Sequence, residues 1–165
     1  MKHAVAFALS TVALVAAPAY AKTFPIPAEN PIATVSIPDT WSLHDYEGGV
    51  EGSSPDGKVY IAVEQVQADD VKAATEEGVK FFAKQGVDID FDSLKTQEGK
   101  INGLPAFDMD MAGKDKDGPT EVDLTLVGTN ASDKFLMLYY WGAPDAAQAN
   151  LKDLKAIADS IQATK

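Results

Sequence analysis

The sequence contains no cysteine and no arginine among its 165 residues. Without cysteine the chain has no disulfide, no thiolate nucleophile and no zinc site built from thiolates. The missing arginine removes the planar group that binds phosphate through two parallel hydrogen bonds. The 14 basic residues are therefore all lysine, against 25 acidic residues, for a net charge of −11. Because nucleic acid is bound through a basic surface, this charge argues against a nucleic-acid partner.

A long apolar run is also missing beyond the N-terminal region. Residues 4–17 are mainly apolar, follow the basic Lys2 and precede an Ala19-Tyr20-Ala21 end, which is the order of a secretory signal. The run falls short of the roughly 20 residues that a helix needs to span a bilayer. We therefore expect residues 1–21 to be a cleaved signal peptide and residues 22–165 to form a single domain.

The cleavage has consequences for charge and location. It would remove one of the 14 lysines and leave a net charge of −12 on the mature chain. Because no cysteine stands near the cleavage site, lipid cannot be attached there, and no stable membrane anchor is expected. We expect the protein to be periplasmic, exported through its cleaved signal peptide.

The rest of the chain alternates between strand and helix patterns. Val71, Ala74, Gly78 and Phe81 recur at helical spacing, Asp69 or Asp70 offers an N-cap and Gly86 a stop. Gly78 costs such a helix about 1 kcal/mol relative to alanine, so we expect it to pack closely on a sheet. Expected strands cover 33–37, 41–46, 58–67, 89–101, 104–111, 120–127 and 135–141, and a second helix opens at Pro144.

The connections between these strands favour antiparallel pairing. Asn102-Gly103 is a strong hairpin signal, and a second hairpin turns over residues 113–118. Residues 135–141 are apolar on both faces, which places this strand in the middle of a sheet covered on both sides. The expected fold class is α+β, a largely antiparallel sheet packed between helices.

Four segments in this order resemble those of a known family. They are IPDTW at 37–41, SPDGKVYIAV at 54–63, INGLPA at 101–106 and ADSI at 158–161. Together they resemble the Mog1/PsbP-like family, in particular its small exported bacterial, DcrB-like members. The resemblance implies an α/β/α sandwich and a role in binding or assisting other proteins, with no shared catalytic set. DcrB itself is lipidated, and this chain departs from it in having no cysteine.

Two motifs that carry chemistry in other proteins are incomplete here. His44 stands beside Asp45, but the chain has no GxSxG elbow, and neighbouring residues in a strand point to opposite faces. Gly57-Lys58 is followed by Val59, where a phosphate-binding loop needs serine or threonine to hold magnesium. We assign no catalytic and no cofactor-binding residue from sequence.

The acidic second hairpin is the most informative cluster. Asp108 and Asp110 share one face of their strand, and Glu121 and Asp123 share one face of the next. A turn centred between residues 115 and 116 would pair Asp110 with Glu121 and Asp108 with Asp123. Like charges opposite one another destabilise a sheet unless lysine, water or a cation intervenes. The face is then either solvated or a site for a hard cation such as calcium, with these four carboxylates as metal ligands.

These observations favour a periplasmic, non-enzymatic binding or assembly-assisting protein whose partner is another periplasmic protein. A calcium-binding protein that uses the acidic hairpin is one alternative. A hydrolase that uses aspartate and glutamate as acid and base is another. Four aromatic residues either pack in the core or form an exposed anchor for a partner. They are Trp41, Tyr46, Tyr140 and Trp141.

Overall fold

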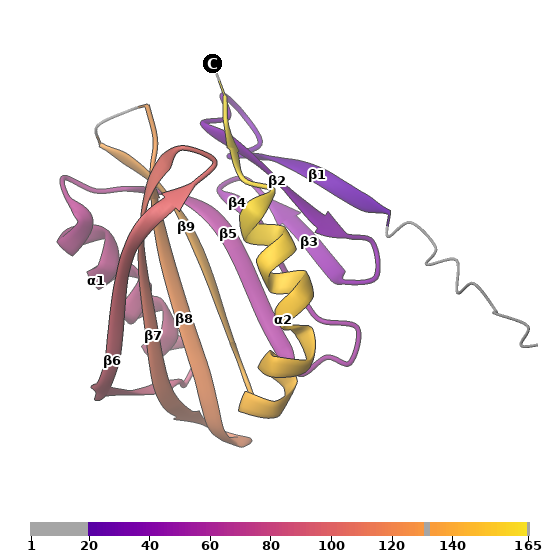
Figure 1. The fold of residues 1–165 in the computed structure, drawn as a ribbon, viewed down its shortest axis with the longest axis vertical. Helices are drawn as coiled ribbons and strands as arrows, with labels where there is room; N and C mark the ends of the chain where they lie inside the picture. The colour runs from indigo at the N-terminus through magenta and orange to yellow at the C-terminus, as the bar shows by residue number, and fades with distance from the viewer. Residues whose placement is uncertain (1–19, 131–132, 165) are drawn as a thin grey trace, which may run out of the picture.

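A seven-stranded sheet forms the centre of the fold in the computed structural model, which describes residues 20–130 and 133–164 (Figure 1). The expected signal peptide lies outside these residues except for Tyr20 and Ala21. All neighbouring strands are antiparallel, in the order β3-β4-β5-β9-β8-β7-β6. A second sheet has the order β1-β2-β10. Within the described part of the chain, neither helix is long and apolar enough to cross a membrane.

The bounds of the elements follow the chain from β1 to β10. The strands are β1 Ala21–Ile26, β2 Ala33–Pro38, β3 Ser42–Tyr46, β4 Gly49–Ser53, β5 Val59–Gln67, β6 Asp88–Ile101, β7 Leu104–Asp115, β8 Gly118–Gly128, β9 Lys134–Gly142 and β10 Gln162–Ala163. The helices are α1 Val71–Lys84 and α2 Pro144–Asp159.

The large sheet is covered on both faces. Helix α1 lies on one face, while α2 and the small sheet lie on the other (Figure 1). Strand β5 shows the division, since Ile61 packs in the core with α2 and the next residue, Ala62, packs in the core with α1. The apolar strand β9 is the fourth of the seven strands, as expected. The prediction of an antiparallel sheet packed between helices is confirmed.

Helix α1 begins and packs as its sequence predicts. The carboxylate of Asp70 accepts a hydrogen bond from the Ala73 N–H at 2.9 Å, and Gly86 has φ of +81° just after the helix. A Cβ on Gly78 would lie 2.8 Å from Cδ2 of Leu124 in β8. The absence of a side chain therefore lets α1 lie directly on the sheet.

Strand β4 is not among the strands that the sequence predicts. It pairs with β3 and β5, and a Cβ on Gly49 would lie 2.1 Å from the Val63 carbonyl oxygen. Glycine here permits a close approach of two backbones. Strand β1 is a second strand that the sequence does not predict, since residues 21–26 pair with β2.

The predicted pairing of the acidic hairpin is wrong by two residues. Strands β7 and β8 continue to Asp115 and Gly118, so that Asp110 lies opposite Asp123. The Asp115 carboxylate accepts hydrogen bonds from the N–H groups of Asp117, at 2.8 Å, and Gly118, at 3.1 Å. These bonds stabilise a shorter turn than expected. The shift is an even number, so each side chain keeps its predicted face.

Candidate functional site

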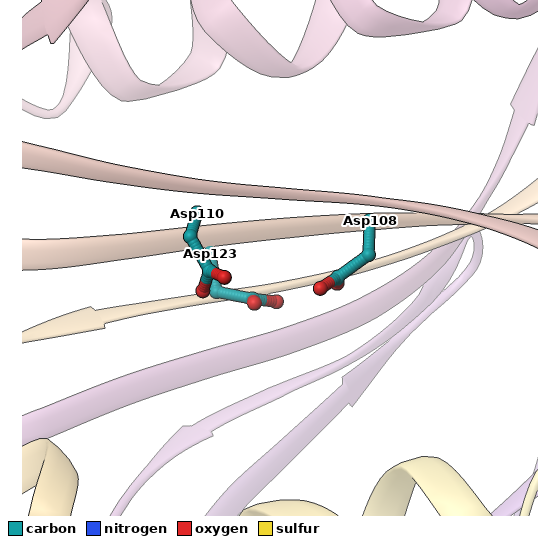
Figure 2. A group of neighbouring side chains, drawn as sticks. All are labelled: Asp108, Asp110 and Asp123. Atoms are coloured by element: carbon teal, nitrogen blue, oxygen red, sulfur yellow. The ribbon is translucent and has the colours of Figure 1, made fainter. Parts of the chain in front are cut away.

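An acidic cleft lies between strands β7 and β8 and helix α2. Asp108 and Asp110 come from β7, and Asp123 comes from β8. Figure 2 shows the three side chains on the same side of the sheet, the side of α2. The cleft has a volume of about 340 Å³, and Gln148 and Lys155 of α2 line its opposite wall. We refer to this surface as the acidic cleft.

The three aspartates form one compact group. One carboxylate oxygen from each lies within 4.8 Å of the others. The Thr125 hydroxyl lies 2.7 Å from Oδ1 of Asp108 and 3.3 Å from Oδ1 of Asp123. Its single proton can be donated to only one of them at a time. Among the described residues, no lysine lies within 4 Å of these carboxylates to neutralise them.

Burial raises the proton affinity of two of these carboxylates, Asp108 and Asp123. Asp123 is only 8% exposed, and burial raises its pKa well above the ordinary value, helped by the charges of Asp108 and Asp110. Burial also raises the pKa of Asp108, with the Thr125 hydrogen bond acting in the opposite direction. The group is therefore suited to hold a proton or to bind a cation.

His44, the histidine beside Asp45, does not belong to this group. It lies on the edge strand β3, at the far side of the sheet.

Glu121 does not join the group as the sequence predicted. The register places it opposite Ala112, and its Oε1 accepts a hydrogen bond from the Tyr140 hydroxyl at 3.3 Å. It still lines the acidic cleft. Sequence reasoning missed Thr125, although its position two residues after Asp123 in a strand indicates the same face. The use of the aspartates as metal ligands remains a prediction.

The four candidate anchor residues are mostly buried. Trp41 is 3% exposed, and its Nε1 donates to Asp153 in α2 at 3.3 Å. Tyr140 is 8% exposed, and Tyr46 is half-buried with its hydroxyl on Glu64 at 2.7 Å. Trp141 is half-buried in an aromatic cluster beside Tyr60. Trp41 and Tyr140 therefore belong to the core.

Exposed apolar side chains gather instead on the face of α1. Phe91 is 57% exposed and Leu94 is 43% exposed, both in β6 where its pairing with β7 is interrupted between Asp90 and Lys95. They line a groove of about 770 Å³ together with Val71 of α1, which is 39% exposed. We call this the α1–β6 groove. Sequence reasoning missed it because an irregular strand exposes residues that simple alternation would bury.

Comparison with models of protein families and with curated protein sequences gives no match. Solved structures, in contrast, match almost the whole chain. Cyanobacterial PsbP (CyanoP) from Synechocystis sp. PCC 6803 has a TM-score of 0.60 at 13% identity, over 94% of this chain and 99% of CyanoP.

Two further structures have the same architecture. LpqN of Mycobacterium tuberculosis has a TM-score of 0.56 at 15% identity, over 88% of this chain and 92% of LpqN. The Saccharomyces cerevisiae Ran-binding protein Mog1p has a TM-score of 0.54 at 9% identity, over 87% of this chain and 95% of Mog1p. At these identities the likeness concerns the fold. The chain has a Mog1/PsbP-like fold.

Proposed function

We propose that this protein is an exported, non-enzymatic accessory protein that binds a partner protein through the α1–β6 groove. The observation that carries the proposal is the exposure of Phe91 and Leu94 at the mouth of an apolar groove. Clustered apolar side chains on a protein surface mark interaction sites. Mog1p, which shares the fold, is described as a Ran-binding protein, and this supports a protein as the partner.

The rim of the groove indicates the chemistry of the partner. Lys72 and Lys80 of α1 line it together with Glu76. Lys80 is paired with Glu77 at 2.8 Å, whereas Lys72 has no carboxylate within 4 Å among the described residues. The partner segment is therefore an amphipathic one, with apolar side chains for the groove and a carboxylate for Lys72.

Photo-crosslinking in cells tests this proposal. A photoreactive residue in place of Leu94 should capture a reproducible partner, and the captured segment should be apolar with an acidic residue. Phe91→Ala should weaken the binding about tenfold or more, because an exposed aromatic anchor contributes over 1 kcal/mol. The matched control places the photoreactive residue at Lys152, which is exposed on α2. Equal capture from both positions, or capture that survives Phe91→Ala, would overturn the proposal.

Export is part of the same proposal. Strand β1 begins at Ala21, so cleavage after Ala21 leaves residues 22–26 of the strand available to pair with β2. LpqN is described as involved in cell envelope biogenesis, which supports an envelope location for a chain with this fold. We expect mass spectrometry of the protein from a periplasmic extract to show Lys22 as the first residue and no lipid. A periplasmic chain that retains Met1 would contradict this expectation.

Cation binding is a second candidate function, favoured by the closeness of the three aspartates. Asp108, Asp110 and Asp123 supply the oxygen ligands that calcium prefers. Calcium at one hundred times its Kd would stabilise the folded state by about 2.7 kcal/mol. We therefore expect millimolar calcium to raise the Tm more than sodium chloride does at the same ionic strength.

The double substitution Asp110→Asn, Asp123→Asn is the variant for this test. It should abolish the calcium response and raise the Tm in calcium-free buffer, because it removes repulsion between neighbouring carboxylates. If calcium and sodium shift the wild-type Tm equally, the cluster binds no calcium and is a solvated acidic surface.

A further inference from the structure

A third cavity lies at the end of the large sheet, where β9 stops at Gly142 and α2 begins at Pro144. Its volume of about 610 Å³ falls within the range of small-molecule sites, about 300–1,000 Å³. Tyr60 of β5 and Trp141 of β9 line it, and they are a directly opposed cross-strand pair. Helix α1 ends at Lys84, and its last turn covers this pair only in part, so both residues are half-buried.

The two rings pack on one another and on the last turn of α1. Their centroids are 4.1 Å apart with an interplanar angle of 31°. The Trp141 ring lies 6.1 Å from Phe81 and 5.8 Å from Phe82, both in the last turn of α1. The Tyr60 hydroxyl donates to the Glu51 carboxylate at 2.5 Å. These contacts hold the Tyr60–Trp141 pair, the aromatic platform, in place before any ligand arrives, which lowers the entropic cost of binding.

Polar groups surround this platform without a dominant charge. They are the carboxylates of Asp115, Asp117 and Asp145, the ammonium groups of Lys58 and Lys116, and the amide of Gln85. Lys116 and Asp117 neutralise one another at 3.7 Å. In a chain of net charge −11, such a nearly balanced rim selects neither a cation nor an anion. It offers both donors and acceptors, which is what hydroxyl groups require.

We infer that this cavity, the aromatic pocket, binds a neutral carbohydrate. A sugar ring presents a flat face of C–H groups that packs on an aromatic ring by dispersion, while its hydroxyls bind the polar rim. The pocket and the α1–β6 groove share no lining residue. The inference therefore stands independently of the partner-binding proposal.

NMR titration of the ¹⁵N-labelled protein tests the inference directly. The chain has two tryptophans, so two indole N–H signals are expected. Chitotriose, cellotriose and maltotriose serve as neutral probes, and choline serves as a cationic one. At least one saccharide at about 10 mM should shift the Trp141 signal and leave buried Trp41 unchanged, as expected for millimolar affinity.

Variants assign the binding to the pocket. Trp141→Leu should abolish it, and Gln85→Ala with Asp145→Asn should weaken it about threefold or more without touching the core. Phe91→Ala, in the α1–β6 groove, is the control that should bind saccharide normally. If Trp141→Leu does not fold, the rim variant, Gln85→Ala with Asp145→Asn, tests by itself whether saccharide binds in the pocket. No Trp141 shift with any saccharide, a response to choline alone, or saccharide binding unchanged by the rim variant would overturn the inference.

Discussion

Phe82→Ala should destabilise the protein by about 3–5 kcal/mol, the usual cost of truncating a fully buried phenylalanine. Phe82 is 0% exposed on the inner side of α1, and its ring centroid lies 5.5 Å from that of Tyr139 in the central strand β9. Removing the ring leaves a cavity between helix and sheet that neither can close. We expect chemical denaturation to show this loss and the Tm to fall by roughly 10 °C or more.

Phe91→Ala is the matched control, since it removes the same ring at an exposed position. Phe91 is 57% exposed, so its truncation should change the unfolding free energy by less than about 0.5 kcal/mol. The two variants together separate stability from partner binding, because Phe82→Ala affects the first and Phe91→Ala the second. Equal destabilisation by both would contradict the placement of Phe91 on the surface.

Asp123→Asn should stabilise the protein at neutral pH in calcium-free buffer. Burial, and then the charges of Asp108 and Asp110, hold the pKa of Asp123 in the folded state well above 3.8. Folding therefore favours the protonated carboxyl. The stability that the protonated Asp123 carboxyl contributes is complete below pH 3.8. This stability is lost as the pH rises through the raised pKa of the folded state. Asparagine has nearly the same shape and no charge, so it avoids this loss.

The measurement is the free energy of unfolding of both proteins between pH 3 and pH 8. We expect similar values at the acidic end and a difference that grows with pH, reaching about 1 kcal/mol at neutral pH. Asp159→Asn is the control, because Asp159 is exposed at the end of α2 and outside the acidic cleft. A difference that shrinks as the pH rises would reverse the assigned direction of the pKa shift.

Local patterns in the sequence were sufficient to predict most of the large sheet and both helices. The apolar run in β9 requires cover on both faces, the Asp70 cap and Gly86 delimit α1, and Asn102-Gly103 closes a hairpin with positive φ at both residues. Each of these signals acts within a few residues along the chain, so its meaning does not depend on distant contacts.

The acidic face was also predictable, because alternation places side chains on one side of a strand whatever the register. The pairing itself was not, since it depends on where the turn closes. The Asp115 carboxylate decides this by binding the N–H groups of Asp117 and Gly118. As a result Asp108 lies opposite Thr125, and Glu121 is separated from the three-aspartate group.

The sequence by itself determined the antiparallel sheet between helices, the acidic character of one hairpin face and the close packing of Gly78. Only the tertiary structure decided that the glycines of β4 form a strand, that Phe91 and Leu94 remain exposed, and that α1 covers Tyr60 and Trp141 only in part. The physical reason is that burial and close approach depend on which distant segment covers a residue. Local periodicity specifies the face of the strand or helix on which a side chain lies. Tertiary packing decides which other segment, if any, covers that side chain.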